Sequence, residues 1–199
     1  MYSGVLVEFR NDITGQIYQL IDTVWDMGLN MEEVHRIALA DVRFGNMDRS
    51  GYNILVAIEE NGPHLIPIDH GMCFIENGLG YTLCGPYWLK FSDKCRFNEA
   101  LSEECINYVG SLNVDADIAF LSQCGWDFPE EYVEKFKINT TFLKKAVAQG
   151  FTLLHIGNMA SFRCNDPMFT LQVIVESEKL DFMTRVENRI DERLKGYNE

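Results

Sequence analysis

The feature that most constrains the fold is a pair of short apolar runs joined by a turn. Ile54 to Ile58 forms the first run, and His64 to Ile68 forms the second. Asn61-Gly62 lies between them, and an Asn-Gly pair between apolar runs is a strong hairpin signal because both residues tolerate positive φ. The sequence therefore predicts a β-hairpin over residues 54–68, which returns the end of the second strand to the start of the first.

Polar residues that carry oxygen ligands flank this hairpin on both sides. Asp48 and Asn53 precede the first strand, with Gly51 between them, and Asp69 follows the second strand. Carboxylate and amide oxygens suit Mg²⁺, which takes only one or two carboxylates from a protein and completes its shell with phosphate and water. In phosphoryl transfer a metal bridges the phosphates and a carboxylate orients the attacking hydroxyl. The pattern therefore favours a phosphoryl-transfer site at the open end of the hairpin.

Longer motifs extend from this region in both directions. His35 opens H-R-I-A-L-A-D-V-R, Asp48 opens D-R-S-G-Y-N-I-L-V, and Leu65 opens L-I-P-I-D-H-G. This order resembles the catalytic and activation segments of the phosphatidylinositol 3-/4-kinase family, in particular the plant-type gamma phosphatidylinositol 4-kinases. The similarity covers roughly residues 31–164 and includes segments 112–126, 142–150 and 156–157.

The resemblance implies roles for individual residues. The catalytic set would be Asp48, Arg49 and Ser50, with Asp48 as the catalytic-loop aspartate, and Asn53 and Asp69 would bind Mg²⁺ as the cofactor. ATP would be the co-substrate, and the phosphate acceptor would be a lipid, phosphatidylinositol, or a protein hydroxyl. Ser50 departs from the family pattern, which usually has histidine there. A serine hydroxyl cannot serve as a base near neutral pH as an imidazole can.

The resemblance also implies the fold class, α+β and predominantly α, as the C-terminal lobe of a protein-kinase-like fold with a small catalytic β-hairpin. We expect a single domain over residues 1–199, made of three parts. These are the catalytic and activation segments at 35–96, a helical remainder at 98–164, and a C-terminal amphipathic helix at about 167–195.

An N-terminal kinase lobe is expected to be missing or rudimentary. The thirty or so residues before the motif contain no lysine to pair the phosphates, and no glycine-rich phosphate-binding motif occurs in the chain. Two alternatives therefore stay open beside the active kinase. The chain could be an inactive kinase-like lobe, a pseudokinase, that acts as a binding or scaffold module. It could also be a fragment of a longer kinase, with the missing lobe upstream or on a partner chain.

Apolar residues at spacings of three and four predict helices on both sides of the hairpin. One helix runs over residues 17–25 with Gly28 as its C-cap, and another starts at Met31 and leads into the motif. Short helices are expected further on, at residues 98–109, 115–123, 130–136 and 140–149.

Three further groups of side chains have predicted roles. Asp41 and Arg43 alternate with apolar residues and are expected either as an extended pair that supports the loop or as an ordinary surface ion pair. Trp126 and Phe128 are expected to anchor the core at a helix junction. The basic residues Lys90, Lys94 and Arg96 either hold an acceptor headgroup or are solvated on a loop whose aromatic residues pack inward.

The charge of the chain excludes some partners. With 30 acidic and 17 basic residues the formal net charge is −13, so there is no positive stripe for nucleic acid and an anionic membrane would repel the surface. No apolar run is long enough to span a bilayer, and the first residues show no signal-peptide pattern. We therefore expect a cytoplasmic protein, either free or peripheral at a membrane.

Overall fold

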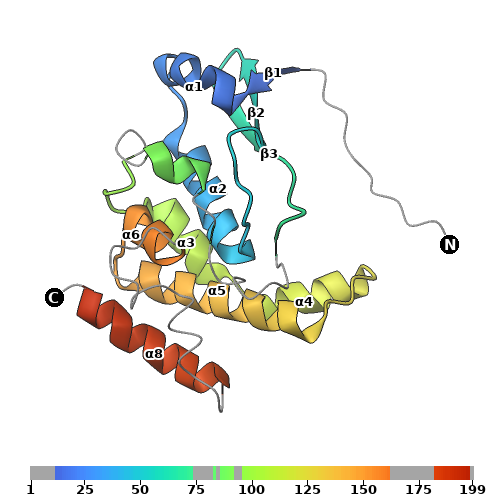
Figure 1. The fold of residues 1–199 in the computed structure, drawn as a ribbon, viewed down its shortest axis with the longest axis vertical. Helices are drawn as coiled ribbons and strands as arrows, with labels where there is room; N and C mark the ends of the chain where they lie inside the picture. Colours follow the sequence, from blue (N-terminus) through green and yellow to red (C-terminus); the bar gives the residue numbers. More distant parts are fainter. Residues whose placement is uncertain (1–11, 74–82, 84–85, 92–95, 162–181, 198–199) are drawn as a thin grey trace.

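A computed structural model describes residues 12–73, 83, 86–91, 96–161 and 182–197 of the chain. A small sheet and one helix lie at one end, and the other helices form the rest of the body (Figure 1). In chain order the elements are β1 (Ile13–Gln16), α1 (Ile17–Asp26), α2 (Met31–Phe44), β2 (Ile54–Glu59), β3 (Gly62–Pro67), the 3₁₀ helix η1 (Tyr87–Phe91), α3 (Glu103–Ser111), α4 (Val114–Gln123), α5 (Glu130–Ala148), α6 (Leu153–Met159) and α8 (Phe182–Tyr197).

The three strands form one antiparallel sheet in the order β1-β2-β3. In the β2-β3 hairpin Ile54 pairs with Pro67 and Glu59 pairs with Gly62, which confirms the predicted hairpin. The turn consists of Glu60 and Asn61, one residue earlier than the Asn-Gly signal indicates. The positive φ of 120° falls on Gly62, the first residue of β3.

Helices α1 and α2 follow the predicted apolar spacing and have clear end signals. Gly28, with φ of 81°, lies just beyond α1, and Asn30 caps α2 by accepting a hydrogen bond from the Glu32 amide at 3.0 Å. Helix α2 continues until Gly45, which has φ of 60°. The prediction of an extended segment around Asp41 is therefore wrong, because the buried face of α2 keeps the helical period through Val42.

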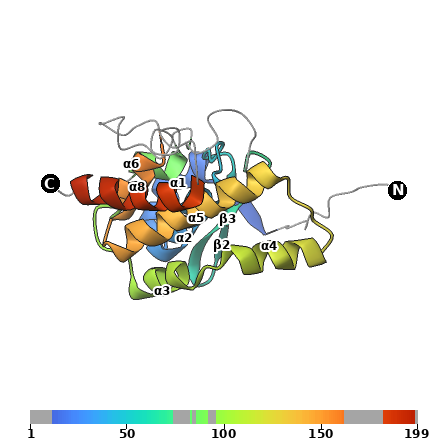
Figure 2. The same ribbon diagram turned by 90° about the horizontal axis from the view of Figure 1, so that it is seen from below.

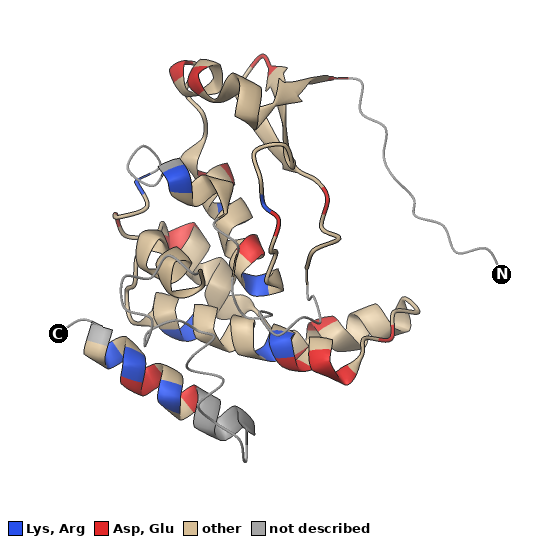
Figure 3. Ribbon diagram, in the orientation of Figure 1, with Lys and Arg blue, Asp and Glu red and all other residues tan. Residues whose placement is uncertain are grey.

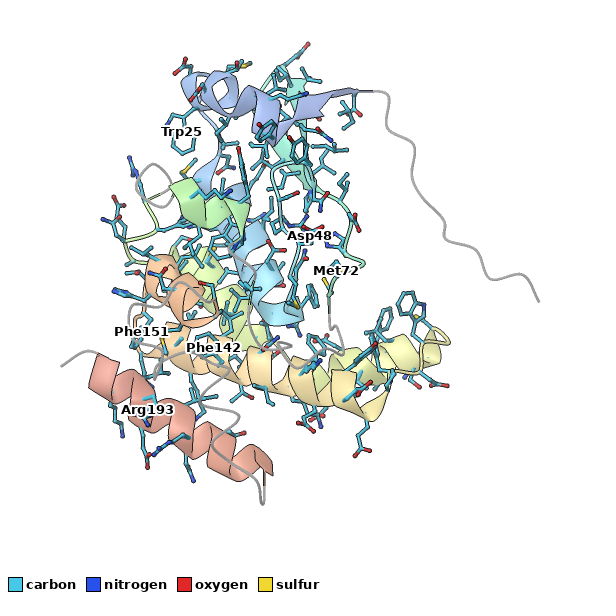
Figure 4. All side chains as sticks on the ribbon, in the orientation of Figure 1. Trp25, Asp48, Met72, Phe142, Phe151 and Arg193 are labelled. Atoms are coloured by element: carbon cyan, nitrogen blue, oxygen red, sulfur yellow. The ribbon has the colours of Figure 1, made fainter. Side chains whose placement is uncertain are left out.

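Helix α5 is one continuous helix of 19 residues, so the prediction of two short helices is wrong. Asn139, Thr140 and Thr141 at the expected break have low helix propensity, but the apolar residues on both sides share one buried face, and tertiary packing overrides propensity. Phe142 is fully buried on this face (Figure 4). The other buried apolar residues of α5 are Phe136, Ile138, Leu143, Ala146 and Val147.

Helix α8 packs along α5, and the two helices lie side by side in both views (Figures 1 and 2). Ile190 and Leu194 are fully buried, and Lys145 of α5 donates to Asp191 at 2.7 Å. This helix is the later part of the predicted C-terminal amphipathic helix. The earlier part, residues 167–181, lies outside the described residues.

Helix α4 and the connection to α5 project from the body (Figure 1). No residue of α4 is buried, Trp126 is 64% exposed, and Phe128 is partly exposed. The prediction that Trp126 anchors the core is therefore wrong, because no second layer of helices covers this connection in the described structure.

Acidic residues occur in the first turns of α4 and α5, and α8 carries both signs of charge (Figure 3). In the part of the chain that the structure describes, none of the helices has both the length and the apolar character needed to cross a bilayer.

Candidate active site

The loop between α2 and β2 carries the first part of the predicted site. The Asn46 side-chain oxygen accepts from the Asp48 amide at 3.1 Å. The Asp48 carbonyl then accepts from the Ser50 amide at 2.8 Å, and the Ser50 carbonyl accepts from the Asn53 amide at 3.1 Å. These successive turns hold Asp48 and Asn53 in a fixed relation at the entry to β2.

Asp48 and Asn53 are in direct contact. Asn53 Nδ2 donates to the Asp48 carbonyl at 2.8 Å and to Asp48 Oδ2 at 3.3 Å. Because the amide nitrogen faces Asp48, the amide oxygen Oδ1 is left over as an acceptor, and no described residue donates to it. Asp48 itself is exposed (Figure 4), and the amide of its neighbour Met47 donates to the Met72 carbonyl, beyond the end of β3, at 3.1 Å.

The hairpin brings Asp69 back to the same end of the sheet. The Ile68 amide donates to the Asn53 carbonyl at 3.0 Å, so Asp69 follows directly beside the backbone of Asn53. Asp69 has φ of 52°, which is uncommon for a residue other than glycine, and its Oδ1 accepts from the Gly71 amide at 3.3 Å. The described contacts do not join the Asp69 carboxylate to Asp48 or to the Asn53 side chain.

Arg49 points into the protein rather than toward solvent. Its side chain is 1% exposed, and Nε donates to Asp41 Oδ1 at 3.0 Å and Oδ2 at 3.1 Å. Nη1 donates to the Asn53 carbonyl at 2.6 Å and to the Ile68 carbonyl at 2.8 Å. Nη2 contacts His70 Nδ1 at 3.1 Å. One guanidinium thus joins α2, the loop and the end of the hairpin.

Asp41 supports the loop, as one of the two alternatives from the sequence predicted, but it does so from within α2 and with Arg49 as its partner, whereas Arg43 pairs with Asp117. Besides Arg49, its carboxylate accepts from Trp88 Nε1 at 2.9 Å and from Asn46 Nδ2 at 3.1 Å. A signal was present, since Asp41 lies at helical spacing from Val34 and Ala38 on the apolar face of α2. An acidic residue in such a stripe must be paired or hydrogen-bonded when it is buried.

The environment changes the ionisation of three groups near Arg49. Burial raises the pKa of Asp41 to about 6, against the opposing effects of Arg49 and of the hydrogen bonds from Trp88 and Asn46. Burial and the nearby guanidinium lower the pKa of His70. The guanidinium can only donate, so His70 Nδ1 accepts and carries no proton. Burial raises the pKa of Cys73 to about 12, which keeps this residue a thiol at neutral pH.

A groove of about 260 Å³ opens on the side of the loop that carries Asp48. The rings of Tyr18 and Tyr52 form one wall and stack with centroids 4.5 Å apart and an interplanar angle of 28°. Lys90 Nζ lies 5.5 Å from the centroid of the Tyr87 ring, within the range of a cation–π interaction. The other lining residues are Arg49, Ser50 and Gly51.

Gly51 lets the Tyr87 ring lie directly against the loop backbone. A Cβ atom at this position would lie 2.7 Å from the Tyr87 ring, which is closer than side-chain contacts allow. Of the predicted basic cluster, Lys90 lines the groove, whereas Arg96 is exposed and lies 3.9 Å from Glu99. Lys94 lies outside the described residues.

The donor set around Asn53 fits Mg²⁺ better than a metal that needs a full protein shell. Among the residues that the structure describes, no three His, Cys, Asp or Glu side chains gather closely enough to hold an ion. The Asn53 amide oxygen and the Asp69 carboxylate offer hard oxygen ligands at the end of the hairpin. Mg²⁺ accepts such a partial shell when phosphate and water supply the rest.

A wider groove of about 630 Å³ lies along the α3-α4 junction and α5, and no predicted site residue lines it. Its lysines already have partners. Lys144 Nζ donates to the Leu112 carbonyl at 2.7 Å, and Lys137 Nζ lies 2.9 Å from Asp115. We therefore attach no ligand to this groove.

Comparisons with known proteins agree with the resemblance of the motifs. Residues 10–156 match the family model for phosphatidylinositol 3- and 4-kinase. From Arabidopsis thaliana, phosphatidylinositol 4-kinase gamma 4 is 38% identical over 138 residues, which cover 67% of this chain and 23% of that protein. Gamma 2 is 40% identical over 65% of this chain and 22% of its own length. Gamma 3 is 31% identical over 86% of this chain and 31% of its own length. The chain thus spans less than a third of each of these relatives.

Proposed function

The chain belongs to the phosphatidylinositol 3- and 4-kinase family, and on this premise we propose that it carries the catalytic loop of a phosphotransferase that moves the γ-phosphate of ATP to a hydroxyl group. The names of its relatives make phosphatidylinositol the first acceptor to test, and a protein hydroxyl is the second. The observation that carries the proposal is the contact of Asn53 with Asp48 at the hairpin end from which Asp69 also emerges.

Asp48 is proposed to orient the attacking hydroxyl. Asn53 Nδ2 engages its Oδ2, which leaves Oδ1 for the hydroxyl proton, and no described residue donates to Oδ1. Ser50 cannot supply a second base, because its hydroxyl does not titrate near neutral pH. A single aspartate serves in the corresponding role in protein kinases, where positioning and electrostatics supply most of the catalysis.

Asn53 and Asp69 are proposed to hold Mg²⁺ through the Asn53 Oδ1 atom and the Asp69 carboxylate. The ion, when bound, would neutralise negative charge on the phosphate oxygens. The contact with Asp48 keeps the Asn53 amide from turning over, so its oxygen stays available to the ion. The hydrogen bond from the Ile68 amide to the Asn53 carbonyl keeps Asp69 next to it at the same end of the hairpin.

The acceptor is proposed to approach through the groove lined by Tyr18, Tyr52, Tyr87 and Lys90. Asp48 and Ser50 line this groove as well, so a hydroxyl bound there would lie beside the proposed catalytic carboxylate. Lys90 is exposed, and in the described structure it has no carboxylate partner, so its charge is available to an acceptor that carries a phosphate. Arg49 also borders the groove, and because its side chain is buried we propose a supporting role for it.

Binding of ATP is the first test. Adding Mg²⁺ and ATP should raise the thermal midpoint of the chain, by mass action on the folded state, and removing the metal with EDTA should cancel the increase. Asp69→Asn should weaken Mg²⁺-dependent nucleotide binding at least tenfold. Asp127→Asn, on the exposed α4-α5 connection, is the matched control and should bind as the wild type does. Unchanged affinity in Asp69→Asn would refute the metal site.

Transfer of phosphate is the second test and separates the kinase from the alternatives. The wild type should transfer labelled phosphate from ATP to phosphatidylinositol in vesicles or to a protein substrate, and Asp48→Asn should lose this activity. Ser50→His should increase the rate, because general-base assistance is typically worth about 10²–10⁴-fold. Nucleotide binding with no transfer to either acceptor would instead select the inactive binding module.

A further inference from the structure

We propose that Asp41 is a positioning residue whose buried carboxylate fixes two segments that border the proposed site, one through Arg49 and the other through Trp88. The first segment is residues 68–70, which include Asp69, and the second is residues 87–90, which line the acceptor groove. The catalytic consequence of this arrangement rests on the proposed function. The fixing of the two segments by Asp41 does not depend on that function.

The first segment is held through Arg49. The Asp41 carboxylate engages Nε of Arg49 from both oxygens, which orients the guanidinium so that Nη1 reaches the carbonyl groups of Asn53 and Ile68. Nη2 contacts the ring of His70. Asp69 is the only residue between Ile68 and His70, so both of its chain neighbours are bound to the same side chain. The position of the proposed metal ligand is thereby tied to α2.

The second segment is held through Trp88. The indole Nε1 donates to Asp41 Oδ2 at 2.9 Å, and the residue is 2% exposed. The edge of the Trp88 ring packs against Phe97 with centroids 5.6 Å apart, and a Cβ on Gly157 would lie 2.8 Å from the ring. Next to Trp88, the Tyr87 amide donates to the Arg49 carbonyl at 2.7 Å. Tyr87 and Lys90, which line the groove, are therefore carried by an anchored turn.

Only a carboxylate satisfies all the donors that meet at this point. Arg49 Nε, Trp88 Nε1 and Asn46 Nδ2 converge on the two oxygens of Asp41. Asparagine has nearly the same shape but replaces one acceptor oxygen with a donor, so at least one of these groups would lose its acceptor. A buried donor without an acceptor is unfavourable, and the local structure should open to relieve it.

Amide hydrogen exchange in three variants of the full chain tests both branches. The reporters are the Ile68 and Cys73 amides for the first segment and the Tyr87 and Leu89 amides for the second, all of which are hydrogen-bonded. Trp88→Phe should speed exchange at least tenfold in the second segment alone. Arg49→Lys, whose ammonium cannot form the same fork, should do so in the first segment alone. Asp41→Asn should do so in both.

Asp117→Asn is the matched control. Asp117 pairs with Arg43, which also lies on α2 and is buried, but this pair does not touch the catalytic loop. Exchange in both segments should stay at the wild-type rate. The proposal is overturned if Asp41→Asn exchanges like Asp117→Asn. If Asp41→Asn fails to fold, Trp88→Phe and Arg49→Lys decide. The proposal is then overturned if each of these variants increases the exchange rate by the same factor in both segments.

Turnover separates this proposal from the proposed function. In an active wild type, Asp41→Asn should lower kcat at least tenfold, whereas Asp117→Asn should leave it unchanged. If the wild type shows no phosphate transfer but the exchange pattern is as expected, the proposed function fails and the positioning role stands. If the wild type is active and exchange in both segments is insensitive to Asp41→Asn, the positioning role fails and the function stands.

Discussion

Asp41 is 2% exposed, and burying an ionised carboxylate costs free energy unless charge and hydrogen bonds compensate for it. Arg49, Trp88 and Asn46 supply this compensation only in part, because burial still raises the pKa of Asp41 to about 6. The folded state therefore holds the proton of Asp41 more tightly than the unfolded chain, in which the pKa is near the ordinary 3.8.

This difference predicts a pH dependence of stability with a definite sign. The contribution of Asp41 to the free energy of unfolding is fully present well below pH 3.8 and is lost as the pH rises through 6. The side-chain amide that replaces the carboxylate in the Asp41→Asn variant does not titrate. The stability of the wild type minus that of Asp41→Asn should therefore fall by on the order of 3 kcal/mol between pH 4 and pH 7. Urea unfolding of both proteins across this range measures the difference.

The other titrating groups are present in both proteins and largely cancel in this difference. Asp117→Asn provides the comparison for removal of an aspartate that is not buried to the same degree, and its difference from the wild type should stay nearly flat over the same range. A wild-type advantage that grows as the pH rises from 4 to 7 would contradict the raised pKa.

Helix α5 has a long buried apolar face, and it also buries one side-chain amide that forms no hydrogen bond in the described structure. Asn139 is 1% exposed, and neither its Oδ1 nor its Nδ2 has a hydrogen-bond partner in the described structure. A buried amide that has lost its water and gained no partner is destabilising by about 1–3 kcal/mol.

Asn139→Leu should therefore stabilise the protein, by roughly 1–2 kcal/mol, because it replaces the amide with an apolar group of similar branching. Thermal or urea unfolding measures the effect. The neighbouring Thr140→Val is the control with the opposite expected sign, since Thr140 Oγ1 accepts from Arg43 Nε at 3.4 Å and that donor would lose its acceptor. Destabilisation by Asn139→Leu would show that the amide has a structural role.

Some of these elements could be predicted from local sequence patterns and others could not. Local signals predicted the hairpin and the first two helices, because apolar spacing and end residues act within a few positions. The loop residues Asp48 and Asn53 could be brought together in the same way. The continuity of α5 could not be predicted in this way. Packing against residues distant in sequence outweighs the low helix propensity of the polar residues at its centre. The role of Asp41 depends on Trp88, which lies 47 residues away, and no local pattern encodes that contact.

For the whole molecule, large aromatic residues divide between the core and the surface in a way that composition does not reveal. Phe142 of α5 is fully buried, whereas Phe120 is 63% and Trp126 is 64% exposed. Phe142 belongs to the core that α5 shares with α2 and α3, and the other two lie on α4 and the connection that follows it.

This division predicts a large difference between two substitutions of aromatic residues by alanine. Phe142→Ala should lower the free energy of unfolding by about 3–5 kcal/mol, because it removes buried area and leaves a cavity. Trp126→Ala should change the same quantity by no more than about 0.5 kcal/mol. Urea unfolding of the two variants beside the wild type measures both values. A cost above about 2 kcal/mol for Trp126→Ala, well outside this range, would mean that this surface is covered in solution.

The bond between Asp41 and Trp88 also bears on the order of folding events. Contacts between residues far apart along the chain form only after the entropy of closing the intervening loop has been lost, so they tend to slow folding. The helix that contains Asp41 and the hairpin can form from neighbouring residues alone. The arrangement of Asp69 and Tyr87 around the proposed site should therefore form late in folding. A nascent chain whose Trp88 is still inside the ribosome would not yet have this arrangement.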